Sequence, residues 1–545
     1  MRRRSLTSLA LLLGVGCAGA VTATSVGGAD EVAVVRCRQG TDEARARRFF
    51  EQARSLVDEG RWQAARQAIL AALALDADEP EALDLLGMIE EQRGALEAAI
   101  TAYRRAVAAD PQGGTFYFNL GRALVKNEAW VEAEAALRQA AGLLPDSPRP
   151  HGYLGLILRR LQRPAEAAAA FERALRLDPQ QGELAFDLAT ARRAAGDDVG
   201  ALEAARRAAE LLPDNPSVQH LLARLLAAGH SDDNLVQAAV AYRRALATSS
   251  DRPADGDLYS GLAEVYFRLG LPQEAESALR QAIELQPEKA ENYFNLAQMI
   301  YKQRRYEESL AAYEHALELD PGHGTSQLFR GYALLQLSRE DEALAAFERA
   351  AALLPGNSEP HLEAAKLLID KGRFEAAQAH LMRAVNRGVA PPEVGLLMGR
   401  LRMEQGRATE AISILGRVIE ADPELLEAEY RLGQALVKAG RVEEGRERLA
   451  DYQLRFRKAQ KEAADTLHSQ LDQNSQVYLL WGRLYLAENR PERAVQSLRS
   501  ATELRPDDRR AWRLLVQAYT ALGDLAGAAE AQARLDALKE RTSTP

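Results

Sequence analysis

Small and apolar positions recur along this chain every 34 residues, a much longer period than that of a single helix or strand. Counting each unit from Ala46 as place one, a small residue fills the eighth place, and alanine fills the twentieth and twenty-seventh places. The small residues of the eighth place are Ala53, Gly87, Gly121, Gly155, Ala189 and Ala223. Proline then closes the unit at Pro111, Pro145, Pro179 and Pro213. Each unit therefore predicts two short helices joined by a turn.

The period is interrupted once and then resumes. The segments GHSDDNLV (229–236) and SSDRPADGD (249–257) each lengthen one unit, after which the pattern continues from Gly256. The phrases YFNLGRALVKNEAW (117–130) and YFNLAQMIYKQRRY (293–306) are consequently the same helix in two copies of the unit. The second half of the chain is expected to repeat the architecture of the first half.

Residues 290–323, AENYFNLAQMIYKQRRYEESLAAYEHALELDPGH, contain the most complete unit. An aromatic residue stands in the fourth place, Leu-Ala in the seventh and eighth, and a proline near the end. This arrangement resembles the tetratricopeptide repeat. The resemblance covers about fourteen units from Ala46 to about Leu535. It implies an all-α superhelical solenoid, in which units stack because no single helix pair can bury its own apolar face.

The sequence and the resemblance together give the following expected organisation. Residues 1–20 form a signal peptide and 21–45 a largely flexible lead-in. Repeats 1–6 occupy 46–255, repeats 7–12 occupy 256–474, repeats 13 and 14 occupy 475–538, and 539–545 form a tail. Nothing in this division leaves room for a separate catalytic domain.

Composition agrees with a helical fold and limits the class of partner. Apolar residues make up 47% of the chain but aromatic residues only 6%, because the surplus is alanine and leucine, which favour helices. The formal net charge of −9 argues against a general nucleic-acid binder, which needs a basic surface to release counterions. A basic site, if there is one, must be local.

The first residues, MRRRSLTSLALLLGVGCAGA, predict export. Three arginines precede an apolar stretch too short to span a bilayer, and small residues follow, which fits a signal cleaved after Ala20. Residues 14–17 also resemble a bacterial lipobox, in which Cys17 would be lipidated. We therefore expect an exported, periplasmic protein, with anchoring to the outer membrane as the consequence of lipidation. Cys37 is interpreted as an idle thiol, with an intermolecular bridge as the alternative.

The resemblance implies that the first helix of each unit lines the concave face, mainly through the fifth, ninth, twelfth and thirteenth places. Apolar side chains follow the fifth and twelfth places, and cations gather at the ninth and thirteenth places. From Arg122 to Arg224 no acid occupies these places. Such a groove favours an acidic, extended peptide. The candidate partner-binding residues are Phe118, Arg122, Lys126, Arg159, Arg160, Phe186, Arg193, Arg224, Phe294, Tyr301 and Lys302.

A purely structural interpretation of these residues stays open. The arginines could pair with acids on adjacent helices, and the aromatic residues could fill space between helices. Asn119 and Asn295 are consensus residues of the repeat and are interpreted as architecture. The carboxylate clamp known from some members of the family is not predicted, because the cations it requires are missing around both asparagines.

One segment departs from the repeat. Residues 446–471, RERLADYQLRFRKAQKEAADTLHSQL, add length between two units and carry apolar residues at helical spacing beside several cations. The first interpretation is an overlong second helix that projects past its repeat. The alternative is an arm for docking or dimerisation.

The sequence contains no catalytic signature. The histidines are scattered, and the chain has no HExxH motif, phosphate-binding loop, GxSxG elbow or CxxC pair. We expect no enzyme activity, cofactor or metal, and a non-catalytic scaffold for protein partners. The alternatives are a lipid-anchored assembly factor for a secretion, pilus or polysaccharide-export complex, and an accessory subunit of a modifying enzyme.

Overall fold

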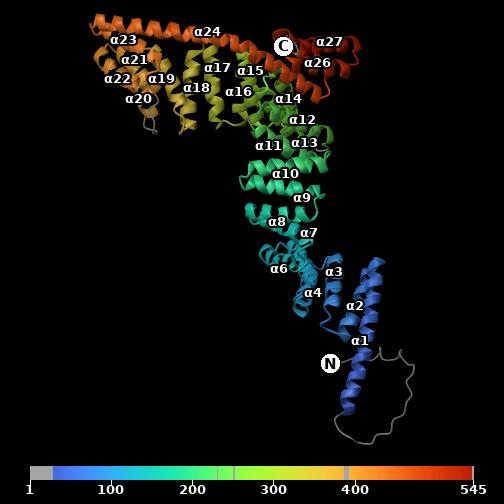
Figure 1. The fold of residues 1–545 in the computed structure, drawn as a ribbon. Helices are drawn as coiled ribbons and strands as arrows, with labels where there is room; N and C mark the ends of the chain where they lie inside the picture. Colours follow the sequence, from blue (N-terminus) through green and yellow to red (C-terminus); the bar gives the residue numbers. More distant parts are fainter. Residues whose placement is uncertain (1–28, 230, 250–251, 386–391, 543–545) are drawn as a thin grey trace. The chain divides into compact units, whose positions relative to one another are not determined.

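The computed structural model describes residues 29–542 apart from 230, 250–251 and 386–391. Within these ranges the chain forms 27 α-helices, α1 to α27, and no β-strand (Figure 1). The all-α solenoid predicted from the sequence is confirmed. The predicted signal peptide and Cys17 lie outside the described residues. None of the described helices combines the length and the apolar character that crossing a membrane requires.

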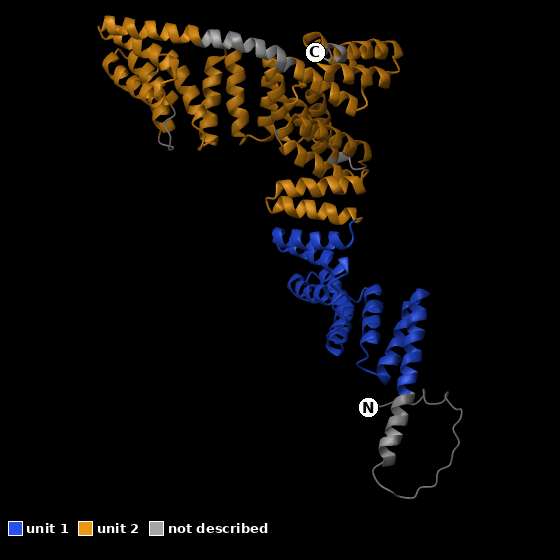
Figure 2. Ribbon diagram, viewed as in Figure 1, with its two compact units in different colours: residues 1–179 blue, residues 180–545 orange. Residues whose placement is uncertain are grey.

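The chain divides into two compact units, residues 1–179 and 180–545 (Figure 2). The helices of the first unit are α1 (Ala29–Asp58), α2 (Trp62–Leu75), α3 (Pro80–Gln92), α4 (Leu96–Ala109), α5 (Gly114–Lys126), α6 (Trp130–Leu143), α7 (Pro148–Arg160) and α8 (Pro164–Leu177).

The second unit contains the remaining helices. They are α9 (Gly182–Ala194), α10 (Asp198–Leu211), α11 (Pro216–Ala228), α12 (Asp232–Thr248), α13 (Arg252–Arg268), α14 (Pro272–Leu285), α15 (Ala290–Lys302), α16 (Tyr306–Leu319), α17 (Gly324–Gln336), α18 (Glu340–Leu353), α19 (Glu359–Asp370), α20 (Phe374–Val385), α21 (Pro392–Glu404), α22 (Ala408–Ala421), α23 (Leu426–Lys438), α24 (Val442–Ala487), α25 (Pro491–Leu504), α26 (Arg509–Leu522) and α27 (Leu525–Thr542).

Helix starts follow the register of the repeat. The first helices α3, α5 and α7 begin at Pro80, Gly114 and Pro148, the residues that open successive units of the sequence pattern. Proline suits the first turn of a helix because its missing N–H has no partner there. Between the two helices of a pair the chain turns through a residue of positive φ, such as Gly94 at 77°. Local sequence therefore sets where these first helices begin.

The core of each helix pair is formed by one small residue facing one large residue. Gly155 on α7 lies against Phe171 on α8, whose side chain is fully buried. A Cβ atom at Gly155 would lie 2.7 Å from the Phe171 ring. The absence of a side chain at the eighth place thus allows the two helices to pack closely, as the sequence predicts.

Two expected boundaries differ in the structure. The lead-in was expected to be largely flexible up to residue 45. In the structure it is helical from Ala29, where α1 begins, well before the first repeat. The long helix expected over 446–471 does not end before repeat 13. Instead α24 runs from Val442 to Ala487 as one helix, and it serves both as the second helix of repeat 12 and as the first helix of repeat 13. The sequence 446–487 contains no proline and glycine only at Gly482, so it lacks the residues that usually end a helix.

The end of α24 returns to the middle of the array within the second unit (Figure 1). Trp481 on α24 donates its indole N–H to the carbonyl of Leu269, at 2.6 Å and 212 residues away in sequence. The Tyr485 hydroxyl donates to Glu274 at 2.7 Å. One continuous apolar cluster includes residues of α11 to α15 together with residues of α24 to α27. We call this contact the C-terminal junction.

Candidate functional site

A basic hollow lies at the end of α7 in the first unit. It has a volume of about 420 Å³ and is lined by Trp130, Leu156, Arg159, Arg160 and Gln162. The Arg160 guanidinium lies over the Trp130 ring, 5.5 Å from its centre. This spacing is within the range of a cation–π contact. The hollow thus combines two cations with an aromatic and an aliphatic surface.

Local sequence places these side chains together. Arg159 and Arg160 form the last turn of α7, where cations are favoured by the partial negative charge of the helix end. Trp130 opens α6, the second helix of the preceding repeat. Gln162 adopts a φ of 59°, which turns the chain sharply into α8. Arg160 is exposed and forms no salt bridge within the part of the chain that the structure describes.

Arg122 and Lys126 are neutralised by a carboxylate of the preceding repeat. The Arg122 guanidinium donates two hydrogen bonds to Glu91, at 3.0 and 2.9 Å, and Lys126 lies 2.5 Å from the same carboxylate. The Glu91 side chain is only 5% exposed. Arg122 and Lys126 therefore pair with an acid on an adjacent helix, which is the structural interpretation that the sequence left open. The acid comes from the preceding repeat, because no acid occupies the inner places of their own repeat.

Phe118 lies in the core and does not offer an open surface. Its exposure is 4%. The ring packs edge-on against Tyr153, with a centroid distance of 5.4 Å, and the Arg149 guanidinium covers it at 4.8 Å. Phe118 therefore acts as filler between helices, the alternative that the sequence left open.

Three more of the predicted residues lie on α9 and α11, in the second unit. Phe186 is half-buried, whereas Arg193 and Arg224 form no salt bridge with any described residue. Burial lowers the pKa of His220, and the nearby Arg224 and Arg193 lower it further, against a smaller opposing effect of Asp257. Burial is therefore the main cause of the lowered pKa, and the two arginines add to it.

Phe294, Tyr301 and Lys302 belong to a more aromatic part of the second unit. Phe294 packs against Phe329 at a centroid distance of 6.0 Å, and Tyr301 meets Tyr306 edge-on at 5.3 Å. Lys302 is exposed and, within the described ranges, has no salt bridge. Phe294 and Tyr301 are half-buried and pack against the core, and Lys302 contributes an isolated charge.

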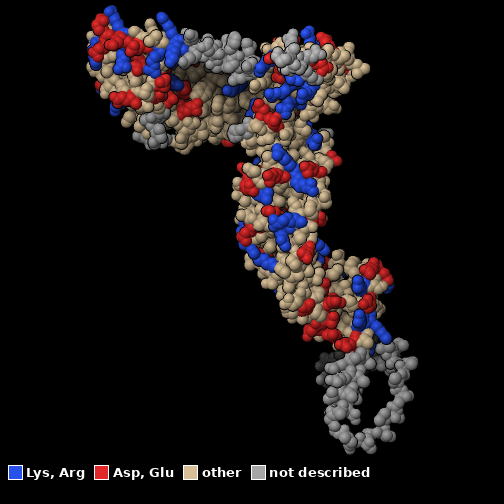
Figure 3. Space-filling view, viewed as in Figure 1, with Lys and Arg blue, Asp and Glu red and all other residues tan. Residues whose placement is uncertain are grey.

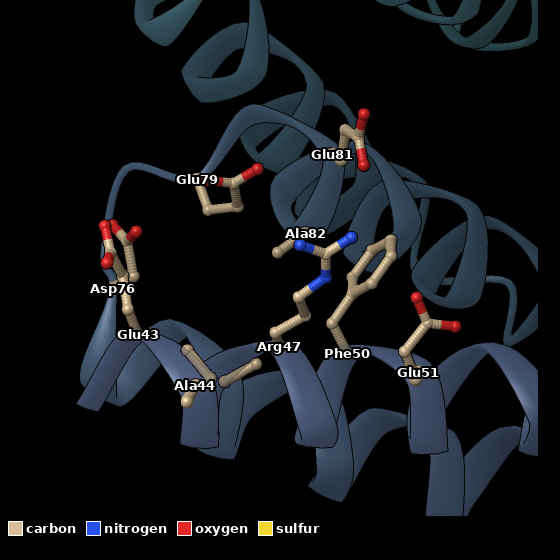
Figure 4. Close-up of a pocket in the computed structure, with 11 residues that line it drawn as sticks. Glu43, Ala44, Arg47, Phe50, Glu51, Asp76, Glu79, Glu81 and Ala82 are labelled. Carbon is tan, nitrogen blue, oxygen red and sulfur yellow. The ribbon is translucent and has the colours of Figure 1, made fainter. Parts of the chain in front are cut away.

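An acidic pocket of about 610 Å³ opens between α1 and α3 (Figure 4). Figure 4 shows Arg47 pointing from α1 into the space between Glu79 and Glu81, with Phe50 beside it. The lining residues are Glu43, Ala44, Ala46, Arg47, Phe50, Glu51, Ala72, Asp76, Glu79, Glu81 and Ala82. Burial raises the pKa of Glu79, and the carboxylates of Asp76, Glu81 and Glu43 raise it further.

Sequence reasoning missed this pocket because it examined only four places of the first helix. The acids that line the pocket come from other places of α1, from the turn before α3 and, with Glu81, from the first turn of α3. Figure 3 shows acidic side chains gathered around α1 to α4. Counting charge over the connecting turns as well as the inner places would have shown that this end of the array is acidic.

The described residues contain no group of three or more His, Cys, Asp or Glu side chains placed to hold a metal ion. His361 and His380 form a buried pair, with their Nδ1 atoms 3.1 Å apart. Burial lowers the pKa of His380, with a smaller effect from Arg383. This pair belongs to the contact between α19 and α20.

Comparison with protein families identifies the repeat along the chain. Two family models described as tetratricopeptide repeat match it, one over 231–290, 260–324, 294–358 and 479–540, and the other over 334–401 and 402–471. Together they cover more than half of the residues. A model described as the C-terminal domain of cilia and flagella-associated protein 70 matches residues 30–258.

Among individual proteins, the type IV pilus assembly protein PilF of Pseudomonas aeruginosa is 27% identical over 184 residues, which are 33% of this chain and 70% of PilF. The cytochrome c-type biogenesis protein CycH of Rhizobium meliloti is 34% identical over 110 residues, or 20% of this chain and 29% of CycH. Human tetratricopeptide repeat protein 28 is 26% identical over 208 residues, and the match spans only 8% of it.

Solved structures give looser likenesses. The structure of Pseudomonas aeruginosa PilF has a TM-score of 0.33 at 22% identity, and covers 38% of this chain and 95% of that chain. The structure of YrrB, described as a TPR protein with an unusual peptide-binding site, has a TM-score of 0.31 at 20% identity, with 35% and 96% covered. At these TM-scores no function is assigned to any residue of this chain from these structures.

Proposed function

Because the chain belongs to the tetratricopeptide repeat family, we propose that it is a non-catalytic scaffold for protein partners, and that the basic hollow at the end of α7 holds an acidic, extended segment of one of them. The observation that carries the proposal is that two cations, Arg159 and Arg160, line the same hollow as the apolar side chains of Trp130 and Leu156.

The chemistry of the hollow favours a segment that alternates acidic and apolar side chains. The guanidinium is planar and suits bidentate contact with a carboxylate. Leu156 is 36% exposed, so an apolar partner side chain would remove its surface from water. Arg122 and Lys126 contribute less, because Glu91 already neutralises them. The acidic pocket between α1 and α3 would repel the same segment and so limit where it binds.

The experiment uses two labelled model peptides, one of alternating Glu and Leu and one of alternating Lys and Leu, with binding followed by fluorescence anisotropy. We expect the Glu peptide to bind about tenfold or more tightly than the Lys peptide, and its affinity to fall as salt is added. The double variant Arg159→Glu, Arg160→Glu should lose this preference. Equal binding of both peptides by the wild type would contradict the proposal.

A matched control separates the hollow from the net charge of the protein. The double variant Arg206→Glu, Arg207→Glu makes the same change on α10, a second helix. We expect it to bind the Glu peptide as the wild type does. If both double variants weaken binding equally, only the total charge matters and the hollow has no special role.

A second candidate function is that of an assembly factor for a pilus or related export complex. The match to PilF over 70% of that protein favours it, since PilF is described as a type IV pilus assembly protein. This candidate includes export and anchoring through Cys17, which mass spectrometry of the mature N-terminus would test. A lipid on Cys17 would support the anchored form, and an unmodified N-terminus following Ala20 would contradict it.

A further inference from the structure

A second pocket lies at the C-terminal junction, far in sequence from the basic hollow. It has a volume of about 350 Å³, in the lower part of the range of small-molecule sites. One wall comes from α12, α13 and α14, and the other comes from Arg490 and Arg493 at the start of α25. The pocket therefore exists only while the C-terminal repeats remain docked on the middle of the array.

Cations exceed anions around this pocket. Arg243, Arg490 and Arg493 line it, and two carboxylates face them. Glu488, whose side chain is fully buried, lies 3.0 Å from Arg243 and 3.0 Å from Arg490. Glu274 contacts Arg493. Since three guanidiniums meet two carboxylates, one positive charge is left without a local counter-charge.

Donors remain available for a ligand. Each guanidinium carries five N–H donors, more than these carboxylates use. The side chains of Arg243 and Arg493 are 42% and 51% exposed, so both reach solvent at the pocket. Tyr259, Gln273 and Ser277 also line the pocket, and none of the three forms a side-chain hydrogen bond with any described residue.

Part of the remaining pocket surface is apolar, beside the polar side chains of Tyr266 and Gln281. Leu246 and Leu262 line it from α12 and α13, and Ala278 lines it from α14. A ligand that matches these features has an oxyanion at one end and a short aliphatic body at the other. A carboxylate fits best, because it is planar and pairs with a guanidinium through two parallel hydrogen bonds.

We propose that the pocket at the C-terminal junction binds a small aliphatic carboxylate, held by Arg243 and Arg493. Because both walls contribute to the pocket, a ligand that binds only the docked form stabilises that form by mass action. Occupancy of the pocket would then control how firmly α24 and α25 stay attached to α12–α14. This inference does not depend on the basic hollow at the end of α7.

The test uses the full chain, with 4-methylpentanoate as the probe and 4-methylpentanamide as its neutral counterpart. Isothermal titration calorimetry should show saturable binding of the acid and about tenfold or more weaker binding of the amide, because a charge-assisted contact is lost. Absence of saturable binding by the acid, or equal affinity for acid and amide, would overturn the proposal.

Two variants assign the binding to this pocket. Arg493→Gln should weaken binding of the acid about tenfold or more, and Arg510→Gln, an exposed arginine of α26 outside the pocket, should leave it unchanged. Ser277→Leu fills the pocket from an exposed position without removing an ion pair, and should abolish binding even if Arg493→Gln proves poorly folded. Unchanged binding in folded Ser277→Leu would overturn the proposal.

Discussion

The close approach of paired helices depends on single glycines. On α21, a Cβ atom at Gly399 would lie 2.6 Å from Leu415 of α22, too close for a normal contact. On α22, Gly416 has no heavy atom within 4 Å of the same constructed position. Gly399 is therefore required for packing, whereas Gly416 only has the general cost of a glycine in a helix. Comparing substitutions at the two positions distinguishes these two effects.

We expect Gly399→Ala to lower the free energy of unfolding by about 1–3 kcal/mol through overpacking. Gly416→Ala should instead raise it by about 0.5–1 kcal/mol, because alanine is the better helix former. Urea unfolding followed by circular dichroism measures both values. A stabilising Gly399→Ala would show that the helices of this pair can separate without loss.

Asp84 gives a residue-scale prediction about pH. Burial raises its pKa from 3.8 to about 6, although the hydrogen bond from Asn119 and the charge of Arg122 oppose the shift. The folded protein thus binds a proton more readily than the unfolded chain, so the contribution of Asp84 to stability is present at low pH and is lost as pH rises through about 6.

Asp84→Asn should therefore stabilise the protein at about pH 7.5 and have little benefit near pH 4, since asparagine can still accept the hydrogen bond from Asn119. Thermal melts of the variant and the wild type at both pH values measure the difference. Asp78→Asn is the control, because the Asp78 side chain is 87% exposed. A benefit that is the same at both pH values would contradict the assigned cause.

At the scale of elements, α24 determines how the last repeats are placed. Its final turns and the turn into α25 bring Glu488 against Arg243 and Arg490, and the Tyr266 hydroxyl donates to the same carboxylate at 2.5 Å. Removing one partner of a buried charged group leaves the others without compensation. Glu488 should therefore contribute strongly to keeping the last repeats docked.

Glu488→Ala should lower the free energy of unfolding by on the order of 3 kcal/mol. Glu492→Ala is the matched control, since Glu492 is exposed on the first turn of α25 and forms no salt bridge with the described residues. Urea midpoints of both variants and the wild type give the comparison. Equal midpoints for the two variants would mean that Glu488 has no special role.

The starts of first helices could be predicted from sequence, because the signals that place them are local. Pro80 and Pro148 each open a first helix where the repeat pattern places them. The continuity of α24 could not be predicted in this way, since it depends on the absence of a stop signal. Of the residues that line the basic hollow, the sequence pointed to Arg159 and Arg160 but not to Trp130, which comes from a second helix. The sequence also pointed to Arg122, which a carboxylate of another repeat neutralises.

At the scale of the whole second unit, the C-terminal junction adds contacts that a simple repeat array lacks. In such an array each repeat touches only its neighbours, so stability is a sum of local terms. Here Tyr266 and Glu488 are in contact although 222 residues separate them in sequence. No local sequence pattern reports a contact over this separation, which is why the sequence did not reveal the junction.

The C-terminal junction predicts that one substitution changes hydrogen exchange in helices far apart in sequence. In Glu488→Ala, amide exchange should accelerate in α12 to α14 as well as in α25 to α27, because both sides of the junction lose their partner. Mass spectrometry of peptide fragments after exchange measures the effect. A change confined to α24 to α27 would mean that the repeats of the second unit behave as a linear array.

The C-terminal junction also changes how the second unit transmits a pulling force. A tension applied between residue 180 and the C-terminus would otherwise stretch every helix pair from α13 to α23 in series. With α24 and α25 attached to α12–α14, the force passes directly through the contacts of Trp481, Glu488 and Arg493. The intervening helix pairs carry no tension until those contacts break.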